Sequence, residues 1–152
     1  MCCGGDDADP LLVDVVVAFP SHDTVRVSLP AAMHRCTAGR SVLLEGVTPE
    51  GSGVLMRLRY RDSLVSGTYP IVVPADTTTL GAAVALRYLL RDVAHAFFFD
   101  SGSVELRRDG AKIDGRIRGS GIENGIRAPT RIEYHDVSLP HQSDTVSCAY
   151  QP

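Results

Sequence analysis

The segment Val54–Arg61 constrains the fold most strongly, because apolar and basic residues alternate along it one by one. Its two sets of alternating side chains are Met56, Leu58 and Tyr60 on one side and Arg57, Arg59 and Arg61 on the other. A period of two residues is that of a β-strand with one face in the core and the other in solvent. We therefore expect a strand here, with the three arginines pointing outward.

Short apolar segments of the same kind recur along the chain, separated by turn residues at intervals typical of β-sandwiches and barrels. Asp109-Gly110 lies between two alternating runs and predicts a hairpin, and Pro70 places the segment Tyr69–Val73 at a sheet edge or a strand start. Residues 118–129 carry three glycines and Asn124-Gly125, and predict a loop or a loose hairpin. The pattern predicts an all-β fold, either an antiparallel β-sandwich or a jelly-roll-like barrel.

The segment Leu80–Phe99 fits two secondary structures. Its apolar residues match a helical stripe, and they also match the alternation of a strand. In a chain made otherwise of strands, we expect a strand over 83–91. One short helix within 80–98 is then confined to a turn near Asp92–His95.

The formal net charge of −3 is confined to the first ten residues. Asp6, Asp7 and Asp9 supply three of the 18 acidic residues, which leaves 15 acids against 15 Lys and Arg in the body. Residues 1–10 are expected to form a flexible acidic tail, and residues 11–152 a single β-sandwich domain of ordinary size. A body without excess positive charge lacks the basic face that nucleic-acid binding requires, so no nucleic-acid partner is expected.

The four cysteines form two groups. Cys2 and Cys3 are neighbours in the tail, whereas Cys36 and Cys148 lie far apart in the body. Of the three possible pairings, only Cys36–Cys148 leaves the tail independent of the domain. We expect that disulfide, which requires an oxidising compartment; the alternative is two buried thiols.

The sequence offers no catalytic or cofactor motif. No two of the five histidines have a metal-ligand spacing, and neither a nucleophile elbow nor a phosphate-binding loop is present. We expect no catalytic residue, metal or cofactor. A hydrolase or metal-dependent enzyme, the third hypothesis, needs two or more of His95, His135, Asp92 and Asp136 to converge in one cleft.

Four segments carry short motifs, namely Cys3-Gly4-Gly5-Asp6-Asp7, Gly67–Pro70, Asp100–Leu106 and Gly115–Gly119. Together they resemble small bacterial lipoprotein β-sandwich domains of unknown function. The first is similar to the lipid-modified start of a mature lipoprotein, and the other three match positions of strand starts and turns. The resemblance is loose, covers residues 3–140 and carries no catalytic residue across. It implies a candidate lipid anchor at Cys3 or Cys2.

These observations predict a non-enzymatic accessory or structural subunit that binds another protein in an envelope complex, of the transport, respiratory or photosynthetic kind. The expected location is periplasmic or extracytoplasmic, at a membrane surface to which the chain is anchored if Cys3 or Cys2 is modified. The candidate contact residues are Arg57, Arg59, Arg61 and Phe98, because arginine is enriched at interfaces and three adjacent phenylalanines cannot all point inward from one strand. The alternative is a β-barrel that binds a small apolar molecule among Phe97–Phe99, Tyr60 and Tyr88.

Overall fold

The computed structural model describes residues 11–16, 24–37, 40–76 and 78–148, and in these ranges the chain forms strands and no helix. In chain order the strands are β1 (Leu11–Val16), β2 (Thr24–Leu29), β3 (Ala32–Cys36), β4 (Ser41–Val47), β5 (Gly53–Arg59), β6 (Gly67–Pro70), β7 (Gly81–Leu90), β8 (Val93–Asp109), β9 (Lys112–Glu123), β10 (Ile126–Ser138) and β11 (Thr145–Val146). The predicted all-β class is confirmed. The described part of the chain contains no helix that could span a membrane.

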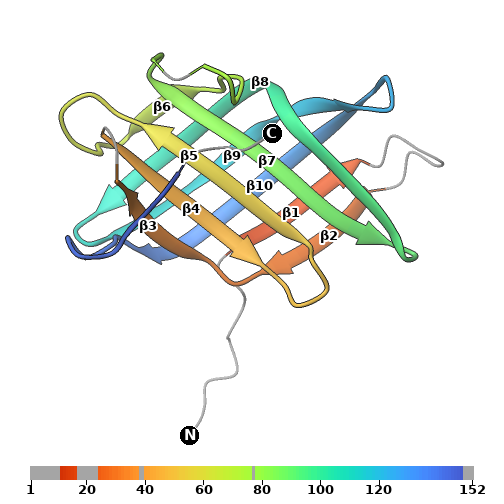
Figure 1. The fold of residues 1–152 in the computed structure, drawn as a ribbon, viewed down its shortest axis with the longest axis horizontal. Helices are drawn as coiled ribbons and strands as arrows, with labels where there is room; N and C mark the ends of the chain where they lie inside the picture. The colour runs from red at the N-terminus through yellow and green to blue at the C-terminus, as the bar shows by residue number, and fades with distance from the viewer. Residues whose placement is uncertain (1–10, 17–23, 38–39, 77, 149–152) are drawn as a thin grey trace, which may run out of the picture.

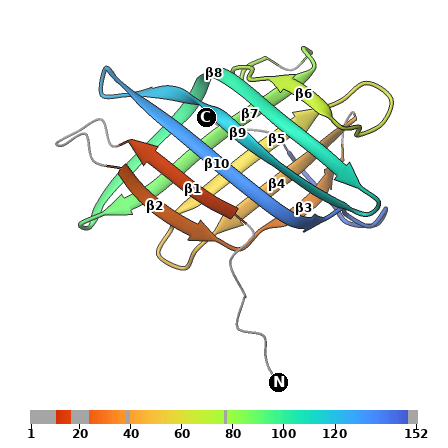
Figure 2. The same cartoon turned by 180° about the vertical axis from the view of Figure 1, so that it is seen from behind.

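The strands pair in the order β11-β3-β4-β5-β7-β8-β9-β10-β1-β2, with β6 added to β8. The sheet curls strongly, so its two halves face each other as layers. Figure 1 shows β4, β5 and β7 crossing in front of β9, β10 and β1, and Figure 2 shows the second layer from behind. Among the described strands no ladder joins β2 to β3, so the barrel-like fold is open along that line.

The long strand β8 joins the two layers. Its first part pairs with β7 and its second part pairs with β9, and the register shifts between Phe99 and Ser101. Gly102 follows this irregularity with a φ of 127°, a backbone conformation that glycine adopts most readily. An irregularity of this kind bends a strand, which lets one strand leave the first layer and enter the second.

The segment 80–98 is a tight hairpin between β7 and β8, and the short helix allowed within it is absent. Arg91 and Asp92 both have positive φ, at 51° and 65°, as the two central residues of a type I′ turn do. The chain between 118 and 129 is likewise a regular hairpin, turning at Asn124-Gly125. Of the two alternatives predicted there, a loop or a loose hairpin, the structure has the hairpin, and the strands β9 and β10 continue to the turn on both sides.

The core lies between the layers and is built from one face of each strand. In β5 the inward side chains Val54, Met56 and Leu58 are fully buried, as the alternation predicts for Met56 and Leu58. The second layer contributes fully buried Ile117 and Tyr134, among others. β1 likewise alternates between buried and half-buried residues.

Candidate partner-binding face

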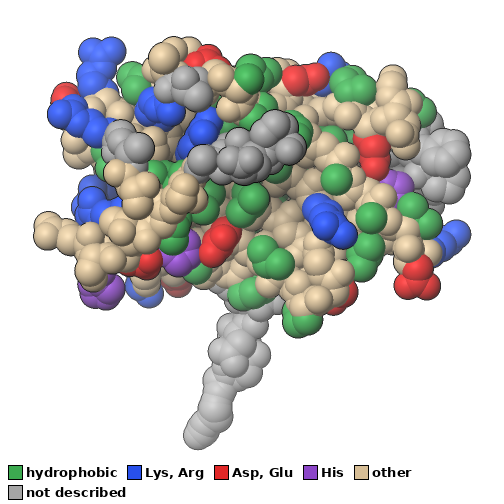
Figure 3. All heavy atoms as spheres, in the orientation of Figure 1, with side chains coloured by type: hydrophobic (Ala, Val, Ile, Leu, Met, Phe, Trp, Pro, Cys, Tyr) green, Lys and Arg blue, Asp and Glu red, His purple; other side chains and the backbone are tan. Residues whose placement is uncertain are grey.

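The outward side of β4, β5, β7 and β8 carries apolar side chains where a solvated sheet face would carry polar ones. The strand register sets two adjacent rows across this face: Val47, Gly53, Arg87 and Ala96, then Glu45, Leu55, Ala85 and Phe98. Phe98 is 47% exposed and Val47 is 55% exposed. In Figure 3, hydrophobic side chains gather on the front face over this layer, around a basic side chain.

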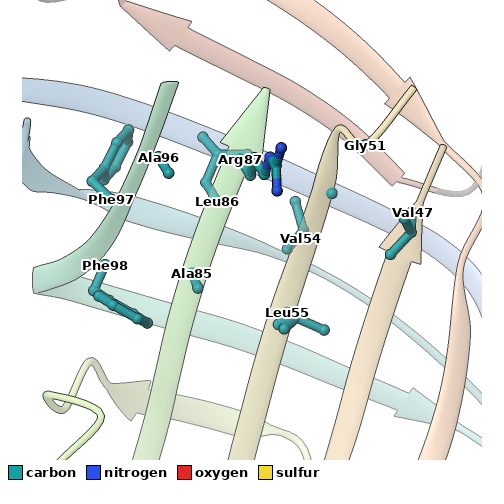
Figure 4. Close-up of a pocket in the computed structure, with 11 residues that line it drawn as sticks. Val47, Gly51, Val54, Leu55, Ala85, Leu86, Arg87, Ala96, Phe97 and Phe98 are labelled. Atoms are coloured by element: carbon teal, nitrogen blue, oxygen red, sulfur yellow. The ribbon is translucent and has the colours of Figure 1, made fainter. Parts of the chain in front are cut away.

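The two rows enclose an open groove of about 320 Å³ that is lined almost wholly by apolar atoms. Figure 4 shows Phe98, Ala85 and Leu55 side by side on three neighbouring strands, with Arg87 and Gly51 at one end. We call this site, defined by Val47, Leu55, Ala85, Arg87 and Phe98, the outer groove. Its shape suits the insertion of a side chain from another molecule.

The outer face of the second layer differs in chemistry. It holds an open hollow of about 390 Å³ lined by charged side chains. Arg116 lies 3.4 Å from Glu105 and Arg107 lies 3.6 Å from Asp114, so cations and carboxylates face each other across neighbouring strands. Paired charges of this kind are ordinary for a sheet face in solvent. The apolar composition of the outer groove is not, and it therefore distinguishes the first layer from the second.

The three arginines of the β5 segment have different environments. Arg57 lies on the outward face as predicted, but it is only 8% exposed, so the expectation that it faces solvent was wrong. Its guanidinium donates to the carbonyls of Cys148, Pro74 and Asp76, at 3.5, 3.3 and 3.4 Å. Arg59 is half-exposed and Arg61 is exposed beyond the end of β5. Of the predicted contact residues, Phe98 alone lines the outer groove.

The C-terminal segment Ser143–Cys148 covers the edge of β3, and we refer to it as the strap. Its strand β11 runs parallel to β3, with Arg35 N donating to Asp144 O at 2.9 Å and Thr37 N to Val146 O at 3.0 Å. The predicted Cys36–Cys148 disulfide is confirmed and closes a separation of 112 residues. The strap therefore protects an edge that would otherwise expose unpaired backbone groups.

His34 fixes the strap by a second contact. Its Nδ1 lies 2.7 Å from Asp144 Oδ1 and its Nε2 lies 3.0 Å from Glu45 Oε1. The hydrogen bond with Asp144, aided by the one with Glu45, raises the pKa of His34 above its ordinary 6.5, although partial burial opposes the shift. The imidazolium thus links the strap to β4.

We expect this linkage to weaken as the solution becomes alkaline. A raised pKa in the folded state means that the stabilisation is fully present below pH 6.5 and is lost as the pH rises through the folded-state pKa. Between pH 6 and pH 9 the free energy of unfolding should fall by about 1 kcal/mol or less, because the two carboxylates are partly exposed. Chemical denaturation of the wild type and of His34→Gln at both pH values measures this; an equal pH dependence in the variant would contradict it, and His141→Gln is the control.

His95 and His135, two of the four residues named for an enzyme, lie at different places in the fold. His95 Nδ1 lies 3.0 Å from Glu123 Oε1, next to the β9–β10 turn, and its ring stacks on Tyr88 with centroids 4.9 Å apart. His135, near the other end of β10, lies 3.9 Å from Glu133. The described residues therefore do not bring His95 and His135 into one cleft. No group of three potential metal ligands gathers among the residues that the structure describes.

Tyr88 and Phe99, which the small-ligand alternative requires, are fully buried in the core. Burial raises the pKa of the Tyr88 hydroxyl to about 12, and this hydroxyl has no hydrogen-bond partner among the described residues. Phe98 points to the opposite side of β8 and Tyr60 is half-buried outside β5. Phe97 and Phe98 both line the outer groove, whereas Tyr60, Tyr88 and Phe99 are not among its lining residues.

Cys2 and Cys3, the candidate lipid anchors, lie outside the described residues.

Comparison with family models, with curated proteins and with solved structures finds no match for this chain. The groove residues Leu55 and Ala85 were missed by sequence reasoning. The sequence nevertheless indicates them. Both are apolar residues at outward positions of their strands, where the alternation would place a polar residue, as in Val54-Leu55-Met56.

Proposed function

We propose that this chain is a non-enzymatic accessory protein that binds another protein through the outer groove. The observation that carries the proposal is the apolar lining of the groove on an outward sheet face, where Phe98 and Val47 are about half exposed. Apolar patches that persist on the surface of a folded domain mark interaction sites. An aromatic side chain beside aliphatic neighbours is also the composition of an interface centre.

The openness of the groove favours a protein partner over a small ligand. Small-molecule sites are concave and bury most of the ligand surface. The outer groove lies across the outward face of four strands and is open to solvent. A partner surface could cover such a face completely, whereas a small molecule would remain largely in water.

The disulfide supports a location outside the cytoplasm, because such bonds persist in oxidising compartments. Within that setting we propose attachment to the membrane surface of the bacterial envelope through a lipid on Cys3 or Cys2. Mass spectrometry of the N-terminal peptide tests the anchor: a diacylglyceryl group supports it, and unmodified cysteines would contradict it. A disulfide between either tail cysteine and the body would also contradict a separate tether.

Affinity isolation from native membranes tests the proposed function. The wild type should recover one membrane protein in stoichiometric amount, and Phe98→Ser should lower its recovery by about 10-fold or more, as expected for an aromatic residue at an interface centre. Ile122→Ser is the matched control, because Ile122 is 44% exposed and lies on β9 in the other layer. Recovery of the wild type as a lone monomer, or equal recovery with Phe98→Ser, would overturn the proposal.

A further inference from the structure

We propose that the partner segment carries a carboxylate next to its apolar side chain, and that Arg87 binds this carboxylate at the end of the outer groove. This inference rests on the proposed function, since it names the chemistry of the segment that the groove would accept. The occupant is therefore an acidic, apolar segment of another protein.

The strand register places Arg87 on the same outward face as the groove. Its direct neighbours are Gly53 on β5 and Ala96 on β8, the two smallest side chains available. A Cβ at Gly51 would lie 3.9 Å from the Arg87 guanidinium, so the glycine leaves that side of the group uncovered. Arg87 is exposed, so a planar carboxylate in solution can approach its guanidinium.

Arg87 differs from the basic residues that already have acidic partners. In the described part of the chain, no carboxylate lies within ion-pair distance of Arg87, whereas ion pairs occupy Arg26, Arg40, Arg107, Arg116 and Arg127. An arginine fork matches the geometry of a carboxylate in two parallel hydrogen bonds. The charge at the end of the outer groove is therefore complementary to an acidic group on the molecule that fills it.

A single arginine favours a carboxylate over a phosphate. Phosphorylated and strongly acidic motifs are bound by clusters of arginines, and among the described residues Arg87 is the one basic residue that lines the groove. Arg87 lies close to the apolar part of the groove, because Gly53 separates it from Val47 in the register and Leu55 lies in the next row. The acidic residue of the partner segment must therefore lie within one or two residues of its apolar side chain.

Selection from a random heptapeptide library displayed on phage tests this inference with the immobilised full chain. Wild-type protein should enrich peptides in which Asp or Glu lies within two positions of a bulky apolar residue. Arg87→Glu should abolish the acidic preference and weaken the best peptide by about 5- to 20-fold, and Arg87→Gln by about 3- to 5-fold. Wild-type binding should also weaken with added salt, because the pair is exposed. Arg118→Glu is the control, since it makes the same charge change on an exposed residue of the other layer.

The outcomes separate this inference from the proposed function. Peptides that depend on Phe98 but show no acidic preference and no effect of Arg87→Glu would overturn the inference and leave the function standing. Failure to select any peptide that Phe98→Ser weakens would contradict both. Tight binding of laurate that Arg87→Glu removes, without peptide selection, would assign the groove to a free amphipathic carboxylate and would also overturn the inference.

Discussion

Replacing Cys36 and Cys148 together by serine should lower the free energy of unfolding by about 2–4 kcal/mol. The disulfide joins residues separated by 112 positions, so its removal gives the unfolded chain much more freedom. Among the described contacts of the strap, the backbone hydrogen bonds to β3, the His34 contact and the Arg57 hydrogen bond then remain. Guanidinium denaturation of the wild type and the double variant measures the loss.

Reductant supplies the control for the disulfide prediction. It should destabilise the wild type by the same amount as the double substitution, and it should leave the double variant unchanged. A variant as stable as the oxidised wild type would show that the bridge contributes little. In that case the strap would be maintained by its other contacts alone.

The substitution Gly115→Ala should destabilise the domain by about 3 kcal/mol or more. A Cβ at this position of β9 would collide with the Glu105 carbonyl oxygen and the Tyr134 hydroxyl. That hydroxyl donates to the Glu105 carbonyl at 2.7 Å and is otherwise buried among core side chains. The added methyl group therefore both overpacks the second layer and separates a buried hydroxyl from its partner.

Two matched variants isolate the cause of this effect. Gly67→Ala, in β6, adds the same methyl group with no atom within 4 Å and should change stability little. Tyr134→Phe removes the hydrogen bond without a collision and should cost about 1 kcal/mol. Thermal denaturation of the three variants measures this. Equal stabilities of Gly115→Ala and Gly67→Ala would contradict the close packing at Gly115.

The difference between the two outer faces has a physical consequence for function. Charged side chains on the second layer pair with one another across strands and need no further partner. The outer groove on the first layer leaves apolar surface in water, which is unfavourable by about 25 cal/mol per Å². A partner that covered the groove would recover that free energy, and Arg87 would select among partners of similar shape.

The sequence by itself determined the all-β class, the hairpin at Asp109-Gly110 and the edge position of the segment that holds Pro70. These features follow from local causes: a period of two residues, turn residues that accept a positive φ, and a proline that cannot donate to a ladder. The disulfide was also predictable, because only one pairing of cysteines left the tail separate. In each case neighbouring residues or simple counting were sufficient.

Only the tertiary structure decided which outward residues face solvent. Arg57 and Arg59 have the same phase in β5, yet Arg57 is covered by the loop at 74–76 and the strap, which come from distant parts of the sequence. The outer groove depends likewise on the register that sets Leu55 beside Ala85 and Ala85 beside Phe98. The alternation along one strand determines the face on which a side chain lies. The neighbours on that face are determined by the pairing of strands that are distant in the sequence, and the alternation holds no information about that pairing.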